Sequence, residues 1–403
     1  LVQPKRYVLP IVTWERDRMA EDVLELDTTP EESEPAVELD YEDVDYIEAP
    51  AVTILVPIYN VERFLHQCLS SLQNQSYVDF EALLLNDGST DSSSEIAHEF
   101  EAKDPRFRVI DKPNSGYGAT LNIGLSQAKG TYVGFLESDD IMFPGALERL
   151  MTVVEAYDAD IARGTYSLYW SKGPRDIVQH PYAEDIINRS IDPRDEPRVF
   201  LYKSAIWCGV FKREMLVNNA ISFLETPGAS YQDTSFAFKT YASAKSAVFF
   251  DEPIIHYRQD NEASSVRSRG KVYAVRKEFD EIDRWLARRD DQTHARTLRR
   301  ASVVARLNAY LWNVDRIAPE YRKEFIRSIS LEFSKMDDAG RIDWDALDSW
   351  RALNIRKIID DPDHYLRLRE SVHGESALSK AAFSLELGGV GALMGALRER
   401  RAR

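Results

Sequence analysis

Three apolar, β-rich runs between residues 51 and 150 each break into polar residues at their carboxyl end. The polar ends are Ile58-Tyr-Asn60, Asn86-Asp-Gly-Ser-Thr-Asp91 and Glu137-Ser-Asp-Asp140. The segments between the runs carry apolar residues at helical spacing, so strands alternate with helices. This alternation predicts a parallel α/β sheet, and the ligands of such sheets bind beyond the carboxyl ends of the strands.

The same pattern predicts individual elements. It indicates strands at 53–58, 80–85, 108–111 and 132–136, and helices at 61–75, 92–101, 145–156 and 234–242. Cys68 falls on the apolar face of helix 61–75, so we interpret it as a core residue. Beyond about residue 267 two further helical stripes predict an appendage packed on the core, without chemistry of its own. The stripes are Val272, Val275, Phe279, Ile282 and Leu286, and Val303, Leu307, Tyr310, Leu311 and Val314, with Pro319 ending the second helix.

Length and composition are those of a globular protein. A chain of 403 residues, 44% hydrophobic and 29% charged, can bury one full α/β core and a smaller second unit. Cys68 and Cys208 provide neither a disulfide framework nor a metal-binding spacing, which favours a reducing compartment. No apolar run reaches eighteen residues and no signal peptide opens the sequence, so we expect a cytoplasmic protein without a membrane span.

The net charge of −16 is concentrated in one segment. Residues 19–48 contain thirteen Asp or Glu and no Lys or Arg, and subtracting them leaves −3 for the rest of the chain. We therefore predict a solvated acidic extension at residues 1–48, which serves either as a disordered spacer or as a partner-binding arm. Because the chain has no basic stripe, we do not expect nucleic acid as a partner.

Several motifs in a fixed order carry a resemblance to a known family. They are Val56-Pro-Ile-Tyr-Asn60, Asn86-Asp-Gly-Ser-Thr-Asp91, Asn114-Ser-Gly116, Asn122-Ile-Gly-Leu125, Ala128-Lys-Gly-Thr-Tyr132 and Glu137-Ser-Asp-Asp140. Together they resemble the family 2 glycosyltransferases, over roughly residues 51–265. The resemblance implies the GT-A fold, a mixed nucleotide-sugar-binding sheet flanked by helices.

On the donor side, the resemblance assigns Pro57, Tyr59 and Asn60 to the lining of the base and ribose. It assigns Asp87 to a base contact, since a carboxylate can accept the N3 hydrogen of uracil. The alternative is that Asp87 is a turn residue, as we expect for Asp91, which caps the following helix. The other predicted donor-binding residues are Asn114, Gly116, Glu137, Ser138 and Arg258.

A divalent cation, Mn²⁺ or Mg²⁺, is the predicted cofactor. Alternation along an extended strand would place Glu137 and Asp139 on the same side, facing one cation that bridges the two donor phosphates. Glu137 departs from the family's Asp-x-Asp pattern, so we predict Asp139 as the direct ligand. A third ligand stays open between Asp260 and His256, because many relatives have a histidine at the position of Asp260.

One further departure concerns the phosphates. Many family members have an arginine where this chain has Leu121, so neutralisation of the diphosphate must depend more on metal or on another basic residue. Arg258 is one candidate, since its planar guanidinium fits a phosphate or carboxylate.

On the acceptor side, Asp233 is the predicted catalytic base, which takes a proton from the attacking hydroxyl. A plain helix N-cap is the alternative for this residue, and the two roles are compatible. The family usually has Glu-Asp here, whereas this chain has Gln232-Asp233. We place Gln232 and Trp207 on the acceptor side, although core packing fits Trp207 equally well.

The C-terminal end has its own pattern. Residues 381–397 contain one charge, Glu386, and four glycines, and Arg398, Arg400, Arg401 and Arg403 follow. The pattern fits an interfacial helix on the cytoplasmic face of a membrane, or a helix that packs on protein, including a second copy of the chain. The predicted division is 1–48, a catalytic domain at 49–266, a helical domain at 267–374 and a tail at 375–403.

These predictions combine into an inverting, metal-dependent glycosyltransferase. It would move a sugar from a nucleoside diphosphate donor, with UDP preferred, to a glycan or lipid-linked hydroxyl in cell-surface polysaccharide or glycoconjugate synthesis. Inversion follows from the resemblance alone. Two alternatives are a nucleotide-sugar-binding scaffold that has lost activity, suggested by the departures at Leu121, Glu137 and Gln232, and a sugar nucleotidyltransferase.

Overall fold

The computed structural model describes residues 49–172, 175–261, 272–372 and 377–401. The predicted acidic extension lies outside these residues, as do the predicted boundaries at 266/267 and 374/375. Residues Glu48–Arg403 form one compact unit, so the predicted division of this part into three domains stays a prediction.

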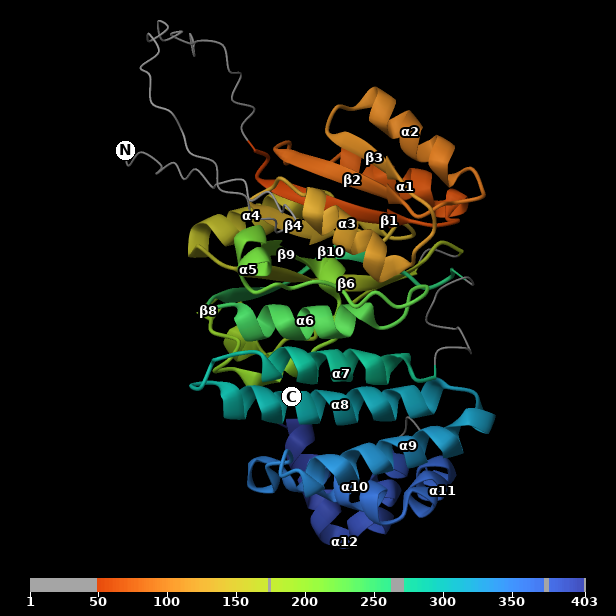
Figure 1. The fold of residues 1–403 in the computed structure, drawn as a ribbon, viewed down its shortest axis with the longest axis vertical. Helices are drawn as coiled ribbons and strands as arrows, with labels where there is room; N and C mark the ends of the chain where they lie inside the picture. The colour runs from red at the N-terminus through yellow and green to blue at the C-terminus, as the bar shows by residue number, and fades with distance from the viewer. Residues whose placement is uncertain (1–48, 173–174, 262–271, 373–376, 402–403) are drawn as a thin grey trace, which may run out of the picture. The chain divides into compact units, whose positions relative to one another are not determined.

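A mixed sheet forms the centre of residues 49–261 (Figure 1). Its strand order is β3-β2-β1-β4-β9-β6-β10-β5. The first four strands are parallel: β1 (Val52–Ile58) pairs with β2 (Phe80–Asn86) and β4 (Tyr132–Phe135), and β2 pairs with β3 (Phe107–Asp111). Every residue of β1 is buried, as expected for a continuous apolar run in the middle of a parallel sheet.

The second half of the sheet is where the strand direction changes. β9 (Gly209–Lys212) runs antiparallel between β4 and β6 (Ile161–Trp170), and β10 (Ala247–Arg258) pairs in parallel with β6. Three short strands pair antiparallel at its margins: β5 (Ile141–Met142), β7 (Arg175–Val178) and β8 (Ser190–Ile191). The predicted mixed sheet with flanking helices is therefore confirmed.

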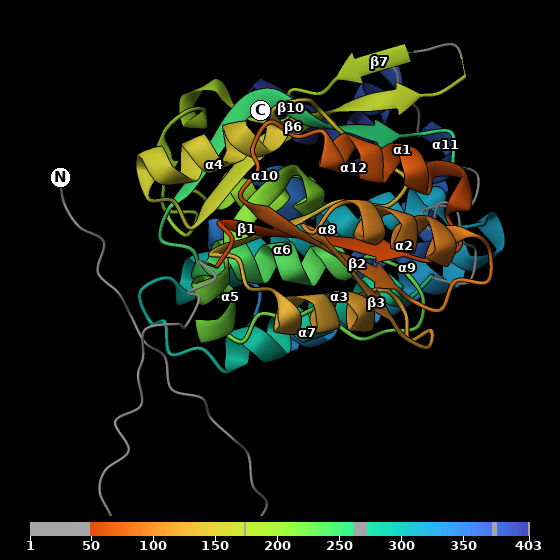
Figure 2. The ribbon, with the colours of Figure 1, turned by 90° about the horizontal axis from the view of Figure 1, so that it is seen from above.

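Helices cover both faces of the sheet, and α1 and α3 lie on opposite sides of β1 (Figure 2). The predicted face of α1 is buried, including Cys68, because its apolar residues recur every three or four positions. The helices of this part are α1 (Glu62–Gln73), α2 (Ser93–Lys103), α3 (Tyr117–Gln127), α4 (Ala146–Tyr157), α5 (Arg213–Asn218) and α6 (Gln232–Ser243), with single 3₁₀ turns at Glu184–Ile186, Pro197–Leu201 and Ile206–Cys208.

Aromatic packing fixes α6 against the sheet. Phe223 stacks on Phe236 of α6 with ring centroids 4.1 Å apart, and Phe135 of β4 meets both rings edge-on. All three side chains are buried. The start of α6 is thereby held close to the carboxyl end of β4.

The chain continues as the predicted helical appendage. α6, α7 and α8 follow one another in layers below the sheet (Figure 1). The predicted stripes on α7 and α8 are largely buried, and Pro319 begins the next helix rather than ending α8, which stops at Arg316. The helices are α7 (Ala274–Ala287), α8 (Ala295–Arg316), α9 (Pro319–Asp338), α10 (Ser349–Asp360), α11 (Pro362–Val372) and α12 (Ala377–Arg401), with a 3₁₀ turn at Trp344–Ala346.

α12 interrupts its helical geometry at Gly388 and Gly389. Phe383 packs edge-on against Trp350 of α10 and Tyr365 of α11, and Leu387 and Ala392 are also buried. Within the described parts of the chain, we find no helix with the length and apolar character needed to span a bilayer.

Candidate active site

A cavity of about 1870 Å³ opens at the carboxyl ends of β1, β2 and β4. Strands, the start of α6 and the end of α8 all contribute to its wall. The structure brings together there nearly all of the predicted site residues: Pro57, Tyr59, Asn60, Asp87, Asn114, Gly116, Glu137, Ser138, Asp139, Trp207, Gln232, Asp233 and Arg258. Their roles stay predictions, whereas their convergence on one cavity is a feature of the fold.

Glu137 and Asp139 lie in a turn rather than on an extended strand. β4 ends at Phe135, and the backbone N–H of Asp140 donates to the Glu137 carbonyl over 2.9 Å. The alternation used to place the two carboxylates on one side is therefore wrong for this segment, although both line the cavity. A turn brings them together where a strand was expected.

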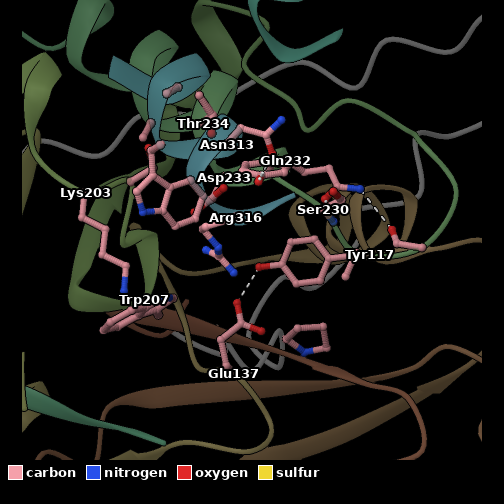
Figure 3. A pocket seen from close by; sticks show the side chains of 18 of the residues that line it. Tyr117, Glu137, Lys203, Trp207, Ser230, Gln232, Asp233, Thr234, Asn313 and Arg316 are labelled. Atoms are coloured by element: carbon pink, nitrogen blue, oxygen red, sulfur yellow. Dashed lines mark hydrogen bonds between the residues drawn. The ribbon is translucent and has the colours of Figure 1, made fainter. Parts of the chain in front are cut away.

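The Glu137 carboxylate is held by a tyrosine. The hydroxyl of Tyr117, in the first turn of α3, donates to Glu137 Oε1 over 2.5 Å (Figure 3). Burial raises the pKa of Glu137 to about 7; the Tyr117 hydrogen bond acts to lower it, and the charges of Asp139 and Asp233 raise it further. The Glu137 carboxylate is therefore shielded from water and lies close to the negative charges of Asp139 and Asp233.

The neighbouring carboxylates fit a divalent cation. Asp140 is buried, and among the described residues no group donates a hydrogen bond to its Oδ2. Burial and the charges of Asp139 and Glu137 raise the pKa of Asp140 well above its ordinary value. Closely spaced carboxylates repel one another when they are ionised, and a bound cation relieves that repulsion. Carboxylate oxygens are also the ligands that a hard divalent cation prefers.

Asp233 lies in the first turn of α6, after a strained residue. Tyr231, the residue before the helix, has a left-handed φ of 62°. Burial raises the pKa of Asp233 to about 6, against the lowering influence of Lys203 and of backbone hydrogen bonds. A carboxyl group with this pKa is mostly ionised at neutral pH and can accept a proton.

Gln232 holds the loop before Asp233. Its side-chain amide donates to Thr226 Oγ1 over 2.9 Å and to the Gly228 carbonyl over 3.0 Å, and its Oε1 accepts from the Ser230 backbone N–H. Gln232 is buried although it borders the cavity. These three hydrogen bonds of the Gln232 side chain are all with residues of its own loop.

Asp87 is hydrogen-bonded to the glycine-rich segment, residues 114–124. Its carboxylate accepts hydrogen bonds from the backbone N–H groups of Ser115, over 2.8 Å, and Gly116, over 3.0 Å, and it pairs with Lys112. Gly116 has a φ of 89°, and a Cβ there would lie 2.9 Å from the Gly228 backbone nitrogen. Asp87 therefore shapes this wall of the cavity, whether or not it also contacts a base.

Arg258 and Trp207 are both packed into the protein. The Arg258 guanidinium donates to the Asp139 carbonyl over 2.6 Å and to Gln67 Oε1 over 2.9 Å. Trp207 stacks on Tyr257 with centroids 4.8 Å apart. Of the two interpretations given for Trp207, its buried side chain matches core packing, with one edge at the cavity.

The structure does not bring Asp260 into the cavity lining. Its Oδ2 accepts from the Ser171 backbone N–H over 3.0 Å and from the Ser171 hydroxyl. His256, the other candidate, stacks on Phe143 at 3.6 Å and pairs with Asp176. Asn261, the residue after Asp260, does line the cavity, and its side-chain amide donates to Asp139 Oδ2 over 2.7 Å.

Sequence reasoning missed several residues of the cavity. Lys203 projects into it, with its ammonium group 4.1 Å from the ring centroid of Tyr257 and close to Trp207. Its side chain is solvent-accessible because the cavity is open, yet the surrounding walls lower its pKa by desolvation. Tyr117 directly follows the Asn114-Ser-Gly116 motif, but Lys203 and the residues of α8 carried no motif.

A second group of ligand-type side chains lies elsewhere. Asp192, Asp195 and His294 bring carboxylate and imidazole atoms within 4.8 Å of one another. Asp192 pairs with Arg194, and His294 hydrogen-bonds Asp291, so ion pairing accounts for this group.

Comparisons with known proteins identify the family of this chain. The family model described as Glycosyl transferase family 2 matches residues 53–211. GlyG, a glycosyltransferase of Streptococcus pneumoniae, is 30% identical over 219 residues, which are 52% of this chain and 70% of that protein. EpsJ, an uncharacterized glycosyltransferase of Bacillus subtilis, is 30% identical over 221 residues, 52% of this chain and 62% of EpsJ. The chain thus spans about three fifths of EpsJ.

Solved structures support the fold. S. aureus TarS 1–349 in complex with UDP-GlcNAc matches with a TM-score of 0.61, covering 79% of this chain and 90% of that one. The sequence identity is 18%, so this likeness concerns the fold. The same portion of TarS in complex with UDP matches with a TM-score of 0.59 and 17% identity, covering 79% of this chain and 90% of that one.

Proposed function

The chain belongs to glycosyltransferase family 2, and we propose that it transfers a sugar from a UDP-sugar to a hydroxyl of a glycan or lipid-linked acceptor. The observation that supports this most is the meeting of Glu137, Asp139 and Asp233 in one cavity at the carboxyl ends of the strands. TarS, which shares the fold, binds UDP and UDP-GlcNAc, and this favours uridine as the base.

In the proposed reaction, Asp233 acts as the base. Its carboxylate takes the proton of the acceptor hydroxyl as that oxygen attacks C1 of the donor sugar and the bond from C1 to the diphosphate breaks. Attack from the side opposite the leaving group inverts the configuration at C1. The raised pKa of Asp233, about 6, suits this role because a stronger base near neutral pH accepts the proton more readily.

A divalent cation fits the same site. Asp139 and Glu137 are the residues that would hold it, with Asn261 positioning the Asp139 carboxylate through their hydrogen bond. When bound, such a cation neutralises the charge that develops on the departing diphosphate. The Tyr117 hydrogen bond keeps the Glu137 carboxylate turned toward the cavity.

For the tail, we propose contact with an anionic membrane surface at the cytoplasmic face. Large apolar side chains of α12 are exposed at Leu378, Leu385, Val390, Met394 and Leu397, and the sequence continues with four arginines. An apolar face beside basic residues fits the interface of an anionic bilayer. This placement would bring a lipid-linked acceptor within reach and accords with a role in cell-surface glycan synthesis.

Calorimetry with a panel of UDP-, GDP-, dTDP- and CDP-sugars, each with Mn²⁺, Mg²⁺ or a chelator, tests the proposal. We expect one UDP-sugar to bind with metal, Asp139→Asn to weaken that binding at least tenfold, and Asp233→Asn to retain it while losing transfer by about 10²-fold or more. Transfer at the wild-type rate by Asp233→Asn would refute the base assignment. Binding of no nucleotide sugar would refute the proposed function and favour a scaffold.

A further inference from the structure

We propose that Arg316, the last residue of α8, binds the diphosphate of the donor, so that the helical appendage completes the active site. This inference rests on the proposed function and deepens it. It assigns a substrate-binding role to a helix whose sequence pattern indicated packing alone.

The cavity requires cationic side chains for such a donor. A nucleoside diphosphate sugar carries two phosphates, and it must approach Glu137, Asp139 and Asp233, whose carboxylates line the same cavity. Like charges in a partly desolvated site repel strongly. A cation from the protein therefore contributes to donor binding even when a metal ion is present.

Four basic residues line the cavity: Lys203, Arg258, Arg316 and Arg369. Arg258 donates to the Asp139 carbonyl and to Gln67 and lies between the rings of Phe64 and Tyr169. Arg369 forms a two-point contact with Asp315, at 2.8 and 2.6 Å.

Arg316 is the one that reaches the carboxylates. Figure 3 shows its guanidinium extending into the space between Asp233 on one side and the hydrogen-bonded pair Tyr117–Glu137 on the other. Lys203 points into the cavity beside Trp207. The planar fork of an arginine can donate two parallel hydrogen bonds to a phosphate, which a lysine cannot.

Stacking orients the Arg316 side chain. Its guanidinium carbon lies 4.0 Å from the ring centroid of Trp312, one turn earlier on α8. The Trp312 ring in turn meets Tyr231 edge-on, with centroids 5.9 Å apart. The arginine therefore rests on an aromatic platform that is continuous with the start of α6.

Hydrogen bonds fix α8 relative to the catalytic loop. The Tyr231 hydroxyl donates to Asn313 Oδ1 over 2.8 Å, and the Asn313 amide donates to the Val272 carbonyl over 3.0 Å. Asn313 is buried, so these bonds are shielded from water. Because Tyr231 lies two residues before Asp233, this contact sets the position of Arg316 relative to the proposed base.

Calorimetry with UDP, UMP and uridine, each in the presence of Mn²⁺ or Mg²⁺, tests this role on the full chain. We expect Arg316→Gln to lower the affinity for UDP at least tenfold and to leave the affinity for uridine unchanged, because only the phosphates contact the guanidinium. Arg316→Lys keeps the charge without the fork and should lose less than Arg316→Gln. The matched control is Arg299→Gln, at an exposed arginine of the same helix, which should bind like the wild type.

The outcomes separate this inference from the proposed function. Equal UDP affinity of wild type and Arg316→Gln overturns the inference and leaves the function standing. A parallel loss of UDP and uridine affinity in both Arg316 variants also overturns it, because it points to a structural role. Failure of the wild type to bind UDP refutes the proposed function instead.

Discussion

Burial separates several carboxylates in or next to the cavity from the many acidic residues at the surface. Glu137, Asp140 and Asp233 all have raised pKa values, and in each case desolvation is the largest cause. Such groups hold protons that exposed carboxylates have already lost at the same pH. The site is therefore poorly adapted to an empty, fully ionised state and well adapted to a bound cation.

The pH dependence of stability follows from this. The pKa of Glu137 in the folded protein is about 7, above its ordinary value of 4.5, so between these values the folded chain holds a proton that the unfolded chain has released. Protonation thus stabilises the fold, and stability falls as the pH rises through 7. We expect the melting temperature in a chelator to fall between about pH 4.5 and pH 7, with Glu137 contributing up to about 3 kcal/mol.

Glu137→Gln should flatten this fall, since the variant has no proton to lose at this position. Asp233, and Glu278 with a pKa of about 8, also hold protons in this range, so part of the slope should remain. Glu99→Gln, at an exposed position of α2, is the control and should keep the wild-type slope. An identical slope in Glu137→Gln and wild type would contradict the raised pKa.

Among the elements, α3 approaches the segment before α6 unusually closely. A Cβ at Gly118 would lie 2.3 Å from the Leu224 carbonyl oxygen, which is backbone and cannot rotate away. Asn122 on the same helix exchanges hydrogen bonds with the backbone of Phe223, at 2.8 and 3.0 Å. The glycine-rich segment thus positions the loop that leads to Asp233.

Gly118→Ala should therefore displace this loop. We expect a loss of about 1–3 kcal/mol in the free energy of unfolding, as for other overpacked sites, together with weaker UDP binding. Urea denaturation and calorimetry measure the two effects. Gly391→Ala is the matched control, because nothing lies within 4 Å of its added Cβ and alanine favours a helix, so it should be neutral or slightly stabilising. Wild-type stability and affinity in Gly118→Ala would contradict the close approach.

The hydrophobic pattern of the sequence predicted some of these elements correctly and missed others. β1, β2 and β4 were predictable because a continuous apolar run in a parallel sheet is a strong signal, and the polar residues after them do converge on the cavity. The turn at Glu137 was missed because strand alternation was extended beyond the predicted strand end at residue 136. Asp260 was named because many relatives have a histidine at its position, and that correspondence gave no signal for its neighbour Asn261.

The contribution of α8 was missed for a different reason. Its apolar stripe correctly indicated which face is buried, but periodicity says nothing about what lies opposite the remaining positions. Trp312 and Arg316 belong to those positions. Their approach to Asp233 depends on tertiary packing between segments about eighty residues apart in the sequence.

At the scale of the whole molecule, α12 carries both packed and exposed apolar side chains, and membrane contact by the tail stays a prediction. One face packs on α10 and α11 through Phe383, so removing the helix would uncover part of the core. The other face keeps Val390 69% and Leu397 47% exposed. Substitutions on the exposed face therefore test membrane contact without disturbing the packed face.

We expect the full chain to float with liposomes that contain anionic lipid, and Val390→Ser with Leu397→Ser to reduce the bound fraction severalfold. Each buried apolar side chain contributes roughly 1.5–3 kcal/mol, and each arginine near an anionic surface about 1 kcal/mol. Salt should weaken binding, because the Debye length falls from about 10 Å at 0.1 M to about 3 Å at 1 M. Leu331→Ser, at a residue of α9 that is 58% exposed, controls for loss of an exposed apolar side chain elsewhere. Equal flotation of the double variant and the wild type would leave α12 as a packing element alone, and the acceptor would then have to reach the cavity without help from this helix.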